Sequence, residues 1–202
     1  MASLPSGTVT FVITDIVGST SRWVAGSMEK ELRLHDAATR EAIEVAGGVW
    51  VKHTGDGVLA AFGDAVSAVE AAIGTHEALE AIVWDGEPLQ VRIGLHTGEA
   101  SPTDGDYFAL AVSTTARVAD TGHGGQTIVS EATHALLGPT GPTTDLGAHT
   151  LKDLGEPVRL FQIDAPGRPA AFPPLRTLGG TPNNLPAQRS SFVGREPQVE
   201  EV

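Results

Sequence analysis

Two aspartates stand where a protein could hold a divalent metal ion. Asp15 ends an alternating stretch in which Val9, Phe11 and Ile13 share one face, and Asp56 lies in a turn between two glycines. Carboxylates on rigid elements suit Mg²⁺, which prefers oxygen ligands and shares its coordination shell with substrate phosphates. Each aspartate taken alone is more typical of a solvated turn, so the pair supports a metal site only together with further signals.

A second group of residues suits a phosphate. Gly18, Ser19 and Thr20 open a helical stretch directly after Asp15. Backbone N–H groups at the start of a helix are free to bind an anion. The same residue types are also common as ordinary helix caps, so this motif is weak by itself.

The elements that would position these residues follow from the hydrophobic periodicity. We predict a strand over 8–15, a helix of about 25 residues that ends at Gly47, strands over 49–52 and 58–62, a helix after the N-cap Asp64 and a strand over 89–95. The turn over 54–57 would join the two short strands as a hairpin. This order is that of a ferredoxin-like βαββαβ core in an α+β fold.

The later part of the chain is predicted to extend this core. We expect a helix over 109–119, a short strand at 128–129 and two strands near 147–152 and 157–163. In the helix after Asp64 an apolar stripe is predicted, and His76 on it is more typical of a buried core histidine than of a ligand. The stripe consists of Val66, Val69, Ile73, His76 and Val83. From residue 165 the chain is rich in Pro and Gly without periodicity, which predicts a linker over 165–202.

Composition narrows the function. Of the 202 residues 41% are hydrophobic, and the net charge of −12 argues against direct nucleic-acid binding, which needs a basic surface. The absence of cysteine excludes disulfides, thiol catalysis and Cys-ligated zinc. No stretch approaches the roughly 18 apolar residues of a membrane helix, and the N-terminus lacks a signal segment, so we expect a cytoplasmic protein without membrane contact.

Four stretches in the expected order resemble the motifs of class III adenylate and guanylate cyclases. They are residues 11–20, 52–56, 91–98 and 106–117. The resemblance covers about residues 8–163 and is strongest to the soluble actinobacterial type, which is often fused to an ATPase and a DNA-binding module. It implies a class III nucleotidyl cyclase fold, with a catalytic domain over 1–164. Residues 185–196 resemble the start of such an ATPase domain, so the linker over 165–202 would lead toward it.

The resemblance implies a two-metal site. Asp15, Asp56 and the carbonyl of Ile16 would hold two Mg²⁺ or Mn²⁺ ions, and Arg92 would bind the triphosphate of the substrate. Two adjacent metal ions can activate an attacking hydroxyl and neutralise a leaving group. Residues 18–20 would then serve as the phosphate seat.

The base of the nucleotide is predicted from two further positions. By resemblance, Lys52 would donate to adenine N1 and Asp106 would accept from the adenine 6-amino group. Guanine presents the reversed pattern, and guanylate cyclases of this family usually carry Glu and Cys or similar residues there. Because unpaired buried polar groups penalise the wrong base, this pair favours ATP as substrate and cyclic AMP as product.

The transition-state residues show one departure from the family. Arg117 matches the arginine that stabilises charge on the α-phosphate, and Lys152 resembles the lysine that meets the terminal phosphates. The family pattern Val-Asn-x-x-x-Arg reads Val112-Ser-Thr-Thr-Ala-Arg117 here, so Ser113 replaces an asparagine. Loss of one such donor commonly costs about 10²–10³ in rate, which predicts a slow enzyme.

Family members build each site from two chains. Asp15, Asp56 and Arg92 would come from one protomer, and the partner would supply the remaining side chains, so a homodimer would carry two equivalent sites. Two alternatives stay open. One is a catalytically silent nucleotide-binding domain with a regulatory or dimerising role, which Ser113 favours. The other is a different two-metal enzyme such as a diguanylate cyclase, which the turn sequence over 54–57 disfavours.

Overall fold

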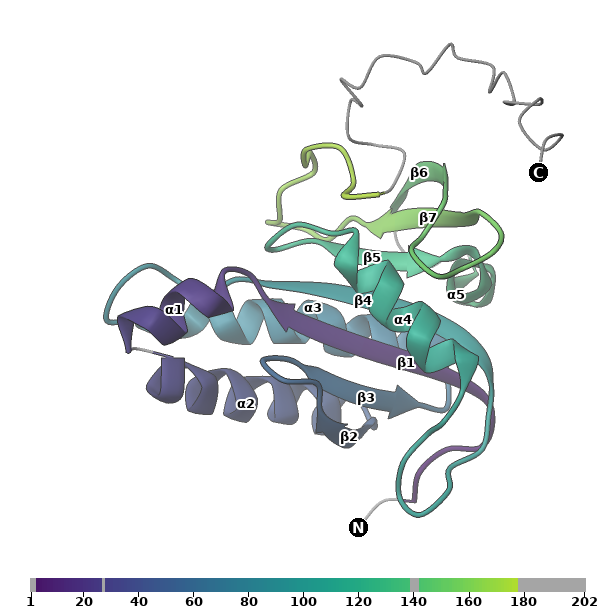
Figure 1. Ribbon diagram of the computed structural model, residues 1–202, viewed down its shortest axis with the longest axis horizontal. Coiled ribbons are helices and arrows are strands. Elements are labelled where there is room, and N and C mark those ends of the chain that lie inside the picture. The colour runs from purple at the N-terminus through teal and green to yellow at the C-terminus, as the bar shows by residue number, and fades with distance from the viewer. Residues whose placement is uncertain (1–2, 27, 139–141, 178–202) are drawn as a thin grey trace, which may run out of the picture.

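The structure, a computed structural model, describes residues 3–26, 28–138 and 142–177. Within these residues seven strands form one mixed sheet in the order β2-β3-β1-β4-β5-β7-β6 (Figure 1). The strands are β1 (Gly7–Ile16), β2 (Val49–His53), β3 (Val58–Phe62), β4 (Val91–Ala100), β5 (Thr127–Ser130), β6 (Thr143–His149) and β7 (Val158–Ile163). The helices are α1 (Ser19–Ala25), α2 (Met28–Val45), α3 (Ala65–Ala81), α4 (Leu110–Asp120) and α5 (Glu131–Leu137).

The predicted ferredoxin-like core is confirmed. Its four strands are adjacent in the order β2-β3-β1-β4, and β1 pairs antiparallel with both β3 and β4. Alternation along β1 sends Val12 and Ile16 into a core that includes Ile43 of α2 and Leu79 of α3. The opposite face of β1 packs against α4, so β1 and β4 have helices on both sides (Figure 1).

Close packing of α4 on β4 depends on one glycine. A Cβ atom built on Gly94 would lie 2.3 Å from the backbone nitrogen of Ala119. Only a residue without a side chain therefore lets the helix approach the strand this closely. The consequence for the site is that the carboxyl-terminal turn of α4 is held at the level of β4.

The predicted long first helix is wrong, because the chain forms two helices. α1 ends at Ala25, and the capping Gly26 adopts a left-handed φ of 79° and donates from its backbone N–H to the Trp23 carbonyl at 3.1 Å. Glycine takes this conformation without steric cost and commonly terminates helices. The chain then starts α2 at Met28, which is fully buried.

The apolar stripe predicted for α3 is confirmed in part, because His76 is buried and the partly buried Val69 packs against the core. Two other members of the stripe do not face the core. Val66 is 37% exposed and Val83 is 92% exposed and lies beyond the helix. The buried face consists of Ala65, Ala68, Ala71, Ala72, Thr75, His76 and Leu79. Alanines allow the helix to pack close to the sheet, so large apolar side chains mark only part of the buried face here. The predicted N-cap is confirmed, since Asp64 accepts from the Ser67 backbone N–H at 2.8 Å.

The carboxyl-terminal extension adds three strands beside β4. β5 is parallel to β4, and β7 and β6 follow in antiparallel pairs. The first of the two predicted strands is displaced, because β6 begins at Thr143 and ends at His149. None of the helices in the described ranges combines the length and hydrophobicity that crossing a membrane requires.

Part of the predicted linker lies against this extension. Leu175 is buried in a cluster with Val118, Leu151 and Leu160, and the Arg176 backbone N–H donates to the Thr121 carbonyl at 3.0 Å. The division at residue 164 stays a prediction. Residues 178–202, which include the tail resembling an ATPase domain, lie outside the described residues.

Candidate active site

Asp15 and Arg92 face each other across β1 and β4. They are register partners, and Arg92 Nε donates to Asp15 Oδ2 at 2.7 Å. Burial raises the pKa of the Asp15 carboxyl, Arg92 opposes that rise, and the negative charge of Asp56 adds to it. A desolvated carboxylate next to a second one is relieved by a bound cation. The two aspartates therefore fit a divalent metal ion.

The hairpin that carries Asp56 is fixed against the end of β1. The Thr54 backbone N–H donates to the Gly57 carbonyl at 2.9 Å, and a Cβ atom at Gly57 would lie 1.8 Å from the Thr14 carbonyl oxygen. The Thr14 hydroxyl also accepts from the Val58 backbone N–H at 3.1 Å. Gly57 thus permits the close approach that brings Asp56 toward Asp15.

The metal ligands would be few. Ile16 ends β1 with its side chain buried, so its backbone carbonyl is the group that a metal ion could use. In the described residues no cluster of three or more His, Cys, Asp or Glu side chains could hold a metal. Two carboxylates and a carbonyl fit Mg²⁺, because this ion completes its shell with water and substrate phosphates.

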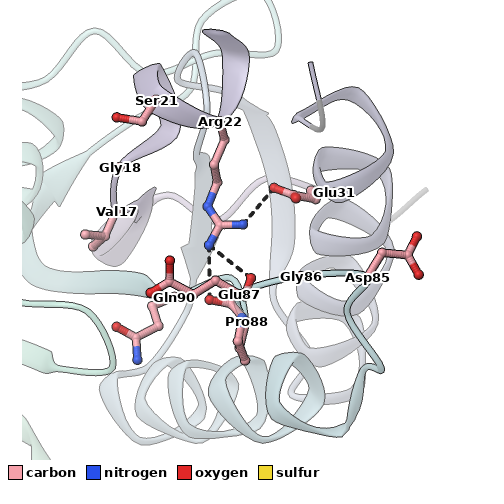
Figure 2. A pocket seen from close by; sticks show the side chains of 10 residues that line it. All are labelled: Val17, Gly18, Ser21, Arg22, Glu31, Asp85, Gly86, Glu87, Pro88 and Gln90. Atoms are coloured by element: carbon pink, nitrogen blue, oxygen red, sulfur yellow. Dashed lines mark hydrogen bonds and ion pairs between the residues drawn. The ribbon is translucent and has the colours of Figure 1, made fainter. Parts of the chain in front are cut away.

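A pocket of about 560 Å³ lies beside the start of α1, next to the predicted phosphate seat. Gly18 lines it in a left-handed conformation with φ 73° and precedes Ser19 and Thr20 in the first turn of α1. Figure 2 shows Arg22 reaching across the pocket toward α2 and the segment before β4. Arg22 donates to Glu31 Oε2 at 2.9 Å and to two carbonyls of residues 87–88 at 3.2 Å.

Arg22 therefore ties α1 to the rest of the domain. Sequence reasoning missed this residue, since an arginine on a short polar helix carries no distinguishing signal. Its partners lie 9 and 65–66 residues away in the chain, where no local spacing rule applies.

The predicted base-binding pair is formed within the chain. Lys52 Nζ from the end of β2 and Asp106 Oδ2 from the loop after β4 make an ion pair. The Tyr107 backbone N–H donates to Asp106 Oδ1 at 2.7 Å, and Lys52 Nζ lies 5.9 Å from the centre of the Phe108 ring. The hydrogen bond from Lys52 holds the pKa of Asp106 below its usual value. Donor and acceptor thus sit side by side at one place on the surface.

The third group lies at the end of α4. Arg117 donates to Asp153 Oδ2 at 2.6 Å and to Asp120 Oδ2 at 3.3 Å. Ser113 is exposed one turn earlier on the same helix, and Lys152 is exposed beside Asp153 in the turn between β6 and β7. The structure thus brings the predicted residues together in three groups: Asp15 with Asp56 and Arg92, Lys52 with Asp106, and Arg117 near Ser113 and Lys152.

The carboxylates of Asp120 and Asp153 were not predicted from the sequence. Arg117 and Asp120 are three residues apart on a helix, and that spacing is a local signal for a pair. Arg117 and Asp153 are 36 residues apart, so only the fold reveals their contact.

Comparison with known proteins assigns the family. Residues 1–164 match the model of the adenylate and guanylate cyclase catalytic domain, and the chain belongs to this family. An uncharacterized protein of Mycobacterium tuberculosis strain H37Rv is 37% identical over 204 residues, covering 96% of this chain and 70% of the relative. Putative adenylate cyclase 3 of Rhizobium meliloti is 32% identical over 147 residues, covering 70% of this chain and 25% of the relative.

Solved structures agree with the fold. An adenylate cyclase of Trypanosoma brucei, solved in its monomeric state, superposes with a TM-score of 0.78 at 25% identity and covers 87% of this chain and 97% of its own. The class III cyclase resemblance and the mixed α+β fold are thereby confirmed. The individual roles of the site residues stay predictions.

Proposed function

We propose that the protein is an adenylate cyclase that converts ATP to 3′,5′-cyclic AMP and pyrophosphate at the interface of a homodimer. The observation that carries this proposal is the pair of Lys52 and Asp106. It presents a cationic donor beside an anionic acceptor, which complements adenine N1 and the 6-amino group. On guanine the donor and acceptor at these two positions are exchanged. Lys52 would then face a hydrogen-bond donor and Asp106 an acceptor.

The metal site supports the same reaction. Asp15, Asp56 and the Ile16 carbonyl would hold two Mg²⁺ or Mn²⁺ ions. Bound there, the ions would supply positive charge that activates the 3′-hydroxyl and neutralises the leaving pyrophosphate. The family is the reason to expect these ions, and the burial of Asp15 next to Asp56 agrees with a cation between them.

The remaining side chains would orient the triphosphate. Arg92 and Lys152 would bind its outer phosphates, and the backbone of residues 18–20 would contact them. Arg117 would donate to the α-phosphate as the 3′-oxygen attacks phosphorus and the bond to pyrophosphate breaks. A fixed guanidinium suits this task, because it places several donors where charge develops.

A homodimer would complete each site. Arg117 with Ser113 and Lys152, together with the Lys52–Asp106 pair, would act on a nucleotide held by Asp15, Asp56 and Arg92 of the partner. Phe108 and Leu110 flank the pair and are 82% and 73% exposed, which offers an apolar surface for a second copy. With ATP as substrate, we expect the enzyme to work in the cytoplasm, with residues 1–164 as its catalytic domain and residues 165–202 as the linker toward a further domain.

One observation favours a second candidate function. Ser113 stands where the family carries an asparagine, and its hydroxyl is shorter and lacks the amide geometry. A domain that binds ATP without turnover, and that acts as a regulatory or dimerising module, would tolerate this change.

Product formation from ATP and GTP tests both functions. The chain is assayed with Mg²⁺ and with Mn²⁺ across concentrations that span dimerisation. We expect cyclic AMP from ATP, loss of it in Asp56→Ala, and recovery of one active site when Asp15→Ala and Lys52→Ala chains are mixed. ATP binding without any cyclic product would instead support the regulatory module, and equal use of GTP would contradict the role of Lys52 and Asp106.

A further inference from the structure

Asp120 is shared by the two arginines that are predicted to contact phosphates. It is the last residue of α4, and its carboxylate accepts from Arg92 Nη2 at 3.4 Å and from Arg117 Nη1 at 3.3 Å. Its backbone carbonyl also accepts from Arg92 Nη1 at 3.0 Å. No motif of the sequence pointed to this residue.

The contacts form a continuous network of ion pairs in which acidic and basic side chains alternate. Arg92 has a carboxylate of its own in Asp15 at 2.7 Å, and Arg117 has one in Asp153 at 2.6 Å. The two contacts to Asp120 are longer, and each guanidinium group uses a different oxygen of this carboxylate, Oδ1 for Arg92 and Oδ2 for Arg117. Asp120 is therefore the central carboxylate of this network. Through it, a change in the partners of either arginine alters the partners of the other.

We propose that Asp120 is a positioning residue through which the two nucleotide sites of the dimer weaken each other. This rests on the proposed function, in which Arg92 and Arg117 of one chain serve different sites. When Arg92 binds a triphosphate, a phosphate oxygen replaces the Asp120 carboxylate as its partner. Asp120 then pairs with Arg117 alone and holds that guanidinium back from the second site.

Because of this exchange, nucleotide binding at one site weakens nucleotide binding at the other. A nucleotide that draws Arg117 away equally releases Asp120 to Arg92, so the coupling acts in both directions, as linkage requires. Asp120 is 52% exposed, so the coupling is small. Exposed ion pairs change an equilibrium by about twofold to fivefold, and we expect the second site to be weaker by that factor.

Calorimetric titration of the dimer with a non-hydrolysable ATP analogue and Mn²⁺ tests the proposal without turnover. The wild-type dimer should show two affinities that differ by about twofold to fivefold beyond the statistical factor. Asp120→Asn removes the charge and keeps the shape, so its two sites should become equal. Thermal unfolding of each variant shows whether the fold is retained, and a general loss of stability would weaken both sites alike.

Asp153→Asn is the matched control. Asp153 contacts Arg117 without Arg92, and asparagine tolerates its left-handed φ of 62°. The difference between the two sites should persist in this variant. Equal sites in the wild type, or a difference that survives Asp120→Asn, would overturn the role of Asp120 while leaving the cyclase proposal intact. A dimer that binds no nucleotide would overturn both.

Discussion

Removal of the segment after β7 is expected to destabilise the end of α4. Leu175 is only 8% exposed and packs against Val118 of α4 and against Leu151, which precedes Lys152. His123 Nε2 donates to the Pro174 carbonyl at 3.1 Å, so a hydrogen bond holds the segment in addition to the packing of Leu175. A chain that stops at residue 164 would lose all of these contacts.

The expected loss of stability follows from the burial of Leu175. Replacing a buried leucine by alanine costs about 2–5 kcal/mol, and the lower part of this range applies because Leu175 lies at the edge of its cluster. For about 2–3 kcal/mol in a domain of this size, the melting temperature should fall by roughly 4–12 °C. Loosening of α4 should displace Arg117, so kcat should fall more than KM rises.

Thermal unfolding and steady-state kinetics of Leu175→Ala measure both quantities. Arg176→Ala is the matched control, because the Arg176 side chain is exposed and its backbone N–H still donates to Thr121. The reasoning would be refuted if Leu175→Ala melted like the wild type, or if the chain ending at residue 164 kept full stability and turnover. The segment would then be the plain linker that its composition predicts.

Three further predictions concern the interior, the hairpin and α4. Gly57→Ala places a Cβ atom 1.8 Å from the Thr14 carbonyl oxygen and should displace the hairpin. Metal-dependent turnover should then fall by about a hundredfold. Gly63→Ala is the control and should have little effect, because there is open space around Gly63. Burial lowers the pKa of His76 to about 3, so the unfolded chain binds the proton more readily below pH 6.5. The free energy of unfolding in urea should therefore fall by about 1.4 kcal/mol per pH unit below pH 6.5, and His76→Gln should reduce this dependence. Ser113→Asn should raise turnover by up to about 10²–10³-fold, and no gain would contradict the predicted defect.

The elements closest to the site were predictable because their signals are local. Alternation marks β1, and the glycine-flanked turn marks the hairpin after β2, so Asp15 and Asp56 are placed correctly on the fold. The break after α1 was missed, since nothing in the residue pattern distinguishes Gly26 from a glycine within a helix. The buried face of α3 was found only in part because alanines, which carry little hydrophobic contrast, form most of it.

The connections within the site could not be predicted. The family motifs name Arg92 and Arg117 separately, and Asp120 and Asp153 are ordinary charged residues in sequence. Arg92 reaches Asp120 only because Gly94 lets α4 lie directly on β4. Such a contact depends on the distance between a helix and a strand, which periodicity does not report.

The pairing of these residues has a consequence for substrate choice. Lys52 is held by Asp106, Arg92 by Asp15, and Arg117 by carboxylates of its own chain. A nucleotide bound as proposed would therefore have to replace existing partners. If a second copy covers this pair as proposed, a ligand that separates Lys52 from Asp106 would have to satisfy both, because a buried polar group left unpaired costs about 1–3 kcal/mol. Adenine offers an acceptor and a donor at adjacent positions and meets this condition. Guanine would meet it at neither position, so under the proposed role of Lys52 and Asp106 their ion pair would favour adenine over guanine.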